Sequence, residues 1–431
     1  SLEIINDPKQ GRPKMGVGTG SVPQHIGGRS RSLRGVCLVT GPVGARGKKH
    51  GCNNWTELPD FCGRSDAGGG VMSWIGLRDQ KGGVFSPVGL GRTDRTPFDL
   101  NAVLPRGTVM FEFASDPRGG DQTLLDYGAT HPWAAGLKLT LCADGTLSLA
   151  QWMGAQRRVY RVATNLLSVT PSITVSYTWD APLRRGVLAV EAGGASAPIL
   201  AELPSPLPLS IRDVMRLMSD RHHCRINSDA RFLAIANDIM PICVLPTLGG
   251  ATLIQTPKGA LPVSKLRMGQ MVTTATGDTA QVRWVGSAEL PARGRFAPLM
   301  LRAPYHGLRH DMVVAPDQRL RARGPEVEYL FGTPHIAMRA GHLVDGVSVR
   351  AASSALLHRY WQVMLDRPAP LAVDGLVFDG LDTSTIQADP ALRAHTVLAH
   401  LPPELLPSFS RPAVPLLQSV EALTLRKLQA A

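Results

Sequence analysis

Apolar residues recur at every second position along the middle of the chain, between residues 85 and 205. Successive side chains of a β-strand point to opposite faces, so this period of two predicts strands with one buried face. Asp144-Gly145 stands between two such runs and predicts a type I′ hairpin, in which both turn residues have positive φ. Many short strands joined by turns predict an antiparallel β-sandwich. The clearest runs are Val109, Phe111 and Phe113; Leu137, Leu139 and Leu141; Leu147 and Leu149; and Val175, Tyr177 and Trp179.

Two of these runs resemble a laminin-G or concanavalin-like jelly roll: Gly-Thr-Val-Met-Phe-Glu-Phe at 107–113 and Ile-Thr-Val-Ser-Tyr-Thr-Trp-Asp at 173–180. After a proline-rich break, Ser210 precedes apolar residues at helical spacing, which predicts a short capped helix that packs back on the sandwich. We therefore assign residues 85–225 to a jelly-roll-like sandwich domain and residues 226–242 to a linker.

Residues 1–84 are rich in Gly, Arg and Ser and show no sustained period, so we expect a partly disordered leader. The sequence has six cysteines and no C-x-x-C pair, which gives no support for a structural zinc site or a thioredoxin-type motif. An even number permits disulfides without assigning them. The six are Cys37, Cys52, Cys62, Cys142, Cys224 and Cys243.

Composition restricts the partners that the chain is expected to bind. Hydrophobic residues make up 44% of the chain, but no apolar stretch reaches the roughly 18 residues of a membrane span. The first residues lack the charged start and apolar core of a signal peptide. The net charge of +12 is spread along the chain, and aromatic residues make up only 5%, so we expect no specific nucleic-acid binding.

Four ordered stretches in the second half of the chain resemble a bacterial Hint domain, the fold shared by inteins and the hedgehog autoprocessing domain. Short strands separated by Gly, Asp and Pro turns agree with the compact all-β fold that this resemblance implies. We therefore assign residues 243–385 to a Hint-like domain and residues 386–431 to a helical or extended C-terminal extension. The stretches are Ala251–Val272, Ala280–Gly286, Val314–Leu320, and Leu330–Gly346 with Tyr360–Arg367.

The resemblance implies an N–S acyl shift as the family's chemistry. A Cys at the first position of the domain attacks the carbonyl carbon of the preceding residue, and a His in the third stretch protonates the departing amide nitrogen. Proton transfer of this kind typically contributes about 10²–10⁴-fold to the rate.

The family's reactive positions carry different residues here. The position of the family Cys is Thr247, and Cys243 lies four residues earlier. Gln318 stands at the position of the family's acidic His, and Ala315 stands where the family usually has a Ser or Thr. A carboxamide does not act as an acid near neutral pH. Two further His positions of the family are Gln362 and Pro368.

Three residues remain as candidates for a catalytic site: Cys243, Thr247 and Gln318. Cys243 stands among apolar residues and is interpreted first as a small buried hydrophobe, with the nucleophile as the alternative. Thr247 could supply an oxygen nucleophile, although it lacks an acid, and Gln318 is interpreted as a structural hydrogen-bonding group.

Other groupings give weaker signals. His222-His223-Cys224 and the pair His306 and His310 lack the tighter ligand spacing of zinc sites, so we expect no metal and no cofactor. Glu112 stands alone between two phenylalanines, whereas glycoside hydrolases need paired carboxylates.

We therefore expect a mainly β protein in which a sandwich is followed by a catalytically degenerate Hint scaffold, and no enzyme activity is favoured. The first alternative is autoprocessing by an N–S acyl shift at Cys243. The second is a carbohydrate-binding or adhesion protein that acts through the sandwich, so that the partner is another protein or a glycan. The family resemblance favours an exported or surface-associated protein.

Overall fold

The computed structural model describes residues 2–4, 72–93, 97–114, 120–164, 172–193, 198–352, 355–381, 383–407 and 414–429. The described residues from 72 onward belong to one compact unit. Most of the predicted leader, including Cys37, Cys52 and Cys62, lies outside the described residues.

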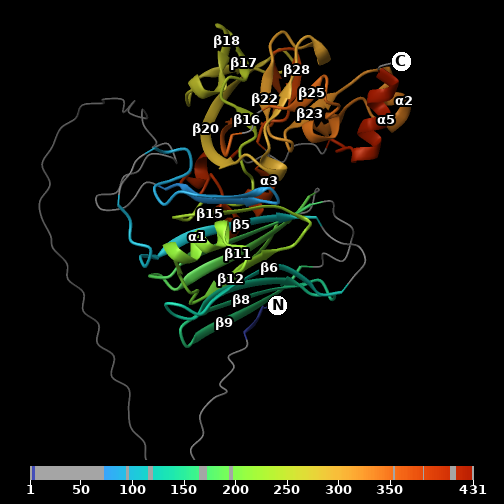
Figure 1. The fold of residues 1–431 in the computed structure, drawn as a ribbon. Coiled ribbons are helices and arrows are strands. Elements are labelled where there is room, and N and C mark those ends of the chain that lie inside the picture. The colour runs from blue at the N-terminus through green and yellow to red at the C-terminus, as the bar shows by residue number, and fades with distance from the viewer. Residues whose placement is uncertain are drawn as a thin grey trace, which may run out of the picture. The chain divides into compact units, whose positions relative to one another are not determined.

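The first half of the unit is a sandwich of two antiparallel sheets (Figure 1). A short pair, β13 (Leu209–Ser210) with β4 (Val103–Leu104), forms a separate two-stranded sheet. The six-stranded sheet has the order β1 (Leu2–Ile4), β9 (Gln156–Ala163), β8 (Thr146–Met153), β7 (Ala135–Leu141), β6 (Gln122–Ala129) and β14 (Cys224–Ile226). The seven-stranded sheet has the order β12 (Ile199–Pro204), β11 (Arg185–Ala192), β10 (Ile173–Asp180), β5 (Arg106–Phe113), β15 (Ala230–Ala236), β2 (Trp74–Asp79) and β3 (Gly82–Phe85).

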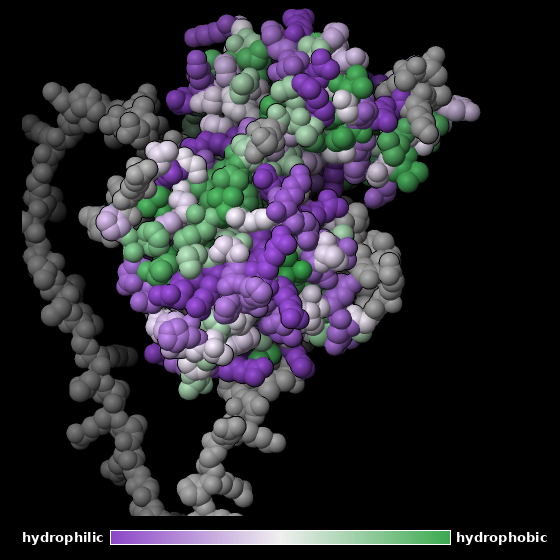
Figure 2. Space-filling model, in the orientation of Figure 1, coloured by the Kyte–Doolittle hydropathy of each residue, from purple (hydrophilic) through white to green (hydrophobic). Residues whose placement is uncertain are grey.

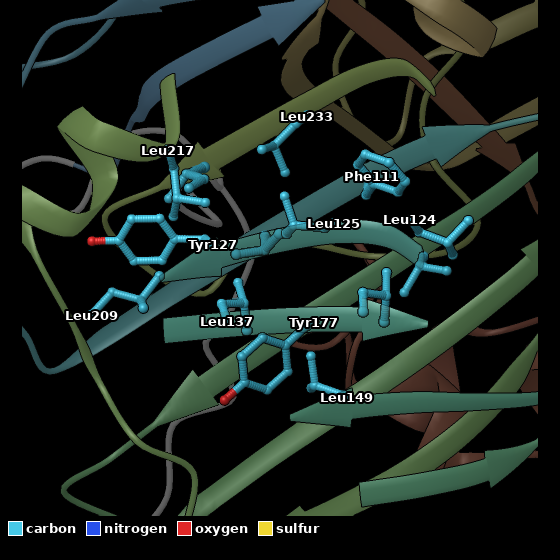
Figure 3. Close-up of a cluster of buried hydrophobic side chains, with 14 of the residues drawn as sticks. Phe111, Leu124, Leu125, Tyr127, Leu137, Leu149, Tyr177, Leu209, Leu217 and Leu233 are labelled. Carbon is cyan, nitrogen blue, oxygen red and sulfur yellow. The ribbon is translucent and has the colours of Figure 1, made fainter. Parts of the chain in front are cut away.

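The core of the sandwich is formed by the apolar positions that recur with a period of two. Figure 3 shows side chains from both sheets and from helix α1 (Ile211–Ser219) meeting in this core. The polar ends of its aromatic residues are satisfied, since the Tyr177 hydroxyl donates to Gln151 Oε1 at 2.9 Å and the Tyr127 hydroxyl donates to Asp213 Oδ1 at 2.6 Å. The mainly β fold expected from the sequence is confirmed, because alternation supplies each sheet with one continuous apolar face.

Three strands of the seven-stranded sheet, β2, β3 and β15, lie wholly or largely outside the segment that the sequence predicted to be the sandwich. β2 begins at Trp74, within the predicted leader, and β15 crosses the predicted linker 226–242. β15 lies between β5 and β2, so these strands form the centre of the sheet and not its edge. β2 pairs with its neighbour β3 as well as with β15, whereas β15 pairs with the distant strands β5 and β2. The strand pairing of the sandwich therefore extends beyond the predicted bounds of 85 and 225.

The hairpin between β7 and β8 also differs from the prediction. Gly145 has φ +78°, but Asp144 does not have positive φ. The Cys142 N–H donates to Thr146 O at 2.8 Å, and the Gly145 N–H donates to Cys142 O at 2.9 Å. This three-residue loop is a type I turn followed by a left-handed glycine, so the type I′ assignment was wrong.

Helix α1 begins where the sequence predicted. Its first turn is closed by a capping box in which the Asp213 N–H donates to Ser210 Oγ at 3.1 Å and the Ser210 N–H donates to Asp213 Oδ2 at 2.9 Å. Val214, Leu217 and Met218 face the core of the sandwich. The cap satisfies N–H groups that the helix itself leaves without partners.

The second half of the unit is a compact β domain with its own core. Its helix α2 (Pro325–Phe331) lies against α5 (Ser419–Gln429) near the end of the chain. One sheet has the order β19 (Met271–Thr273), β20 (Thr279–Pro291), β26 (Leu357–Leu365), β16 (Leu248–Gly249), β22 (Met312–Val314), β21 (Leu299–Leu301) and β25 (Val349–Ala351). The other has the order β18 (Gly259–Pro262), β17 (Leu253–Thr256), β27 (Leu371–Val373), β28 (Leu376–Phe378), β23 (Arg319–Ala322) and β24 (Ile336–Arg339).

A third core joins the two halves. Trp74, Met110 and Phe232 on the outer face of the seven-stranded sheet pack with Leu290 and Tyr360 of the long pair β20–β26. Residues from the short helices α3 (Ser384–Ala388) and α4 (Pro390–Arg393) and the segment after them complete the contact. The seven-stranded sheet is therefore buried on both faces, and every residue of β10 is buried.

Figure 2 shows that hydrophilic and hydrophobic residues are interspersed over much of the visible surface, with a hydrophobic patch on one side of the sandwich. Among the described residues, no helix combines the length and the apolar character needed to cross a membrane.

Candidate functional site

Thr247 enters the second β domain between two strands. The Thr247 N–H donates to Trp361 O of β26 at 3.3 Å, and the Ala315 N–H donates to Thr247 O at 2.8 Å. Leu248, the next residue, pairs with Val314 on one side and with Trp361 on the other. The backbone of Thr247 is therefore fixed on both sides, and its side chain is directed by the sheet.

The side chain of Gln318 is hydrogen-bonded to the Thr247 hydroxyl. The Thr247 Oγ1–H donates to Gln318 Oε1 at 2.5 Å. The carboxamide cannot turn freely, because its Nε2–H donates to Arg319 O at 2.8 Å. The backbone of Gln318 is also fixed, since its N–H donates to Ala315 O and its carbonyl accepts from the Ala340 N–H. The side chain is almost fully buried, with 2% of its surface exposed.

Gln362 completes this polar cluster from β26. Its Oε1 lies 3.3 Å from Thr247 Oγ1, and the residue is buried. The structure thus brings together three of the positions that the motif comparison aligned with the family's reactive residues, Thr247, Gln318 and Gln362. Pro368 lies beyond the end of β26, in the loop before β27.

The chemistry of this cluster is that of a satisfied hydrogen-bond network. A hydroxyl nucleophile must lose its proton to a base, and a departing amide nitrogen must receive one from an acid. The oxygens that approach the Thr247 hydroxyl are both carboxamide oxygens, which accept hydrogen bonds but do not take up protons near neutral pH.

Cys243 has different surroundings from Thr247. It is fully buried and packs with Val187 and Ala189 of β11, on the sandwich, and with Leu392 of α4. Burial and the carboxylate of Glu191 raise the pKa of the Cys243 thiol far above its usual range. The thiolate is the nucleophilic form of cysteine, and these surroundings disfavour it at neutral pH.

A cluster of charges lies next to the polar cluster. Asp317 precedes Gln318, and its carboxylate accepts hydrogen bonds from Arg295 at 2.9 Å and 2.7 Å. Burial alone would raise the pKa of Asp317, but Arg295 and Arg339 outweigh it and hold the pKa below its usual value. Arg295 also binds Glu191 of the sandwich at 3.0 Å.

Glu112 joins the same cluster through the backbone. It is fully buried, its Oε2 accepts from the Arg295 N–H at 2.8 Å, and its Oε1 accepts from Ser172 Oγ at 2.7 Å. A Cβ on Gly294, which has φ +54°, would lie 2.2 Å from Glu112 Oε2. No sequence motif predicts this cluster, and the local signal within it is Gly294, which allows the close approach of Glu112.

The histidine groupings lie apart from the cluster. His223 Nδ1 is 2.6 Å from Asp220 Oδ2, and His310 Nδ1 is 3.2 Å from Asp374 Oδ2. His306 forms part of a one-turn 3-10 helix, Tyr305–Gly307, and its Nε2 is 3.1 Å from Ser348 Oγ. Within the described ranges, no group of three or more His, Cys, Asp or Glu residues has the arrangement of a metal site.

Comparison with known families identifies the second β domain. The model of the Hint domain family matches residues 246–383, which is less than half of the chain. The match begins one residue before Thr247 and leaves Cys243 outside. The Hint-like domain expected from the sequence motifs is thereby confirmed.

Comparison with whole proteins adds little. No curated protein matches the chain. Among solved structures, a leech intramolecular trans-sialidase complexed with 2,7-anhydro-Neu5Ac is 13% identical, with 43% of this chain and 29% of that chain covered. The chain therefore spans less than a third of that protein, and the TM-score of 0.22 carries no argument about fold or function.

Proposed function

We propose that the Hint domain of residues 246–383 does not cleave the chain and instead serves as a structural domain that covers one face of the sandwich. The hydrogen bond from the Thr247 hydroxyl to Gln318 Oε1, at 2.5 Å, carries this proposal. It directs the hydroxyl proton at a carboxamide oxygen that is itself held by the Gln318 Nε2 contact with Arg319 O.

The acyl shift at this position would need two proton transfers. Thr247 Oγ1 would form an ester with the carbonyl carbon of Pro246, the Pro246–Thr247 amide bond would break, and the nitrogen would take up a proton. That nitrogen faces Trp361 O, which is an acceptor and not an acid. Loss of one general acid typically slows such a step by about 10²–10⁴-fold.

The contact with the sandwich supports a structural role. The Trp74 indole N–H donates to Glu289 O at 2.7 Å, and Arg293 binds Asp79 at 2.9 Å. Trp74 and Phe232 are fully buried in the shared core. Burying a large apolar side chain stabilises a fold by about 1.5–3 kcal/mol. Separating the two domains would expose several such side chains to water and would lose the stabilisation that each provides.

We further propose that the protein is exported or belongs to an extracellular assembly, on the strength of the family resemblance. Cell fractionation tests this location, and recovery of the protein only from the cytoplasm would contradict it.

The test of the structural role is the intact mass of the full chain after a day at neutral pH. One sample contains excess dithiothreitol, which captures a thioester, and another contains hydroxylamine, which also captures an ester. We expect a single mass equal to that of the uncleaved chain in both samples.

Two variants make the result specific. A fragment beginning at Cys243 that disappears in Cys243→Ala would establish autoprocessing at that cysteine and overturn the proposal. A fragment beginning at Thr247 that disappears in Thr247→Ala would establish an acyl shift at the threonine. Cleavage that appears only in the Thr247→Cys and Gln318→His double variant would show that the native carboxamide is what blocks the chemistry.

A further inference from the structure

The six-stranded sheet has an outer face that the core does not use. Along β8, Leu147, Leu149 and Gln151 are buried inward, whereas Ser148 and Trp152 alternate with them and are only half-buried. A tryptophan that points away from the core at such a position forgoes much of the stabilisation that burial would give. The position of Trp152 therefore leaves part of its indole on the outer face of the sheet.

Two glycines on the neighbouring strands make room for the indole. Gly128 of β6, Gly136 of β7 and Trp152 of β8 form one continuous row across the sheet. A Cβ on Gly136 would lie 1.9 Å from the Trp152 ring, and a Cβ on Gly128 would lie 3.6 Å from it. The indole thus extends over bare backbone and presents its remaining surface outward.

The other tryptophans of the described sandwich differ in how deeply they are buried. Trp74 and Trp179 are fully buried, and their indole N–H groups donate to backbone carbonyls. Trp133 is half-buried in the loop between β6 and β7, at the end of the sheet where Trp152 lies. Two partly exposed indoles therefore occur at one end of the same sheet.

Cations lie beside Trp152 on the outer face of the sheet. Arg157 pairs with Trp152 across β9, and its side chain is exposed. The next row holds Arg225, Asp126 and Lys138 side by side, with an ion pair of 3.2 Å between Lys138 and Asp126. The last two side chains are each 41% exposed, so the row is accessible to a ligand.

We propose that this outer face binds an acidic glycan, with a pyranose ring packed on Trp152 and a carboxylate or sulfate of the sugar paired with Arg157. The apolar C–H face of a sugar fits an aromatic surface, and a planar guanidinium binds such anions through two hydrogen bonds. Asp126 and the Ser148 hydroxyl lie within the same face and supply acceptors for sugar hydroxyls.

The arrangement favours a glycan over a single-stranded nucleic acid. Nucleic-acid grooves present successive aromatic residues along a continuous basic track. Here both indoles lie at one end of the sheet, so successive bases would find no continuous row of aromatic side chains. The inference goes beyond the role of the Hint domain and does not depend on it.

The test is isothermal titration calorimetry of the full chain with hexasaccharides of galacturonate, with a neutral glucan hexamer of equal length, and with a single-stranded oligothymidylate. We expect the acidic sugar to bind with a dissociation constant below about 1 mM and the neutral sugar to bind at least tenfold more weakly. Added salt should weaken the binding of the acidic sugar.

Variants assign the site. Trp152→Ala should weaken binding by about tenfold, as removal of a central aromatic anchor does, and Arg157→Gln should weaken it while reducing its salt dependence. Arg350→Gln, an exposed arginine on β25, is the matched control and should bind as the native chain does. Trp152→Phe keeps an aromatic ring over Gly136, so it serves as a second variant in case Trp152→Ala does not fold.

Three results would overturn the proposal. These are an absence of binding to the acidic sugar, equal binding by Trp152→Ala when its melting temperature is unchanged, or tighter binding of the oligothymidylate than of the sugar.

Discussion

In the cluster around Thr247, the surroundings fix which atoms donate and which accept hydrogen bonds. Gln318 Nε2 faces a carbonyl, so Gln318 Oε1 must face the Thr247 hydroxyl, and the hydroxyl must donate. Every polar atom of the Gln318 side chain thereby has a partner although the residue is buried. The network is self-consistent as structure, which is the reason that it is poorly suited to proton transfer.

Removing the hydroxyl should therefore cost stability. Thr247→Val keeps the shape but leaves Gln318 Oε1 buried without its donor, and we expect a loss of about 1–3 kcal/mol in the free energy of unfolding. Urea denaturation measures the loss. Thr424→Val on the exposed face of α5 is the control and should change stability by less than about 0.5 kcal/mol. Equal effects of the two changes would show that Thr247 makes no structural contribution.

Asp317 gives the charge cluster a defined dependence on pH. Asp317→Asn should reduce the free energy of unfolding at pH 7 by about 2 kcal/mol, less than for a fully buried pair because Arg295 and Asp317 are 24% and 27% exposed. Because the folded-state pKa of Asp317 is lowered, its contribution is complete above the unfolded value of about 3.9. It is lost as the pH falls through the lower folded pKa. Urea titrations of both proteins from pH 7 to pH 3 measure the difference, and a difference that grows on acidification would contradict this account.

Elements whose signals are local could be predicted from the sequence, and elements formed by distant pairing could not. The Ser210 cap and the period-two strands were identified because the residues that form them are neighbours in the chain. β15 was missed because its strand character comes from pairing with the distant strands β5 and β2. β2 was missed although it also forms a hairpin with β3, because the residues of that hairpin show no sustained period of two. The motif register placed Thr247 and Gln318 at related positions, but their contact depends on side-chain geometry that no motif contains.

The cap of α1 offers a test at the scale of one element. Ser210→Ala removes the hydroxyl of the capping box, and we expect a loss of about 1 kcal/mol in the free energy of unfolding. Ser219→Ala, at the exposed last residue of the same helix, is the matched control. Chemical denaturation compares the two. A larger loss at Ser219 than at Ser210 would show that the cap does not stabilise the helix.

On the scale of the whole molecule, the sandwich and the Hint domain depend on a shared core. The outer face of the seven-stranded sheet carries Trp74, Met110 and Phe232, which would be exposed if the Hint domain were removed. The charge cluster reinforces the contact, because Arg295 of the Hint domain binds Glu191 and Glu112 of the sandwich. A sheet that needs covering on both faces is not expected to be stable with one face open.

The full chain should therefore lose both domains in one thermal transition. Scanning calorimetry is expected to give a single peak, whereas a fragment of residues 72–240 should melt at a lower temperature and bind a hydrophobic dye through its uncovered face. A shorter fragment, residues 85–225, lacks the central strands β2 and β15 and should not fold, which circular dichroism would report. The longer fragment lacks the segments that cover this face, and it also lacks β1, which pairs with β9 at the edge of the six-stranded sheet. Two separate peaks in the full chain, one of them at the melting temperature of the longer fragment, would show that the sandwich is independent and that the shared core contributes no stability.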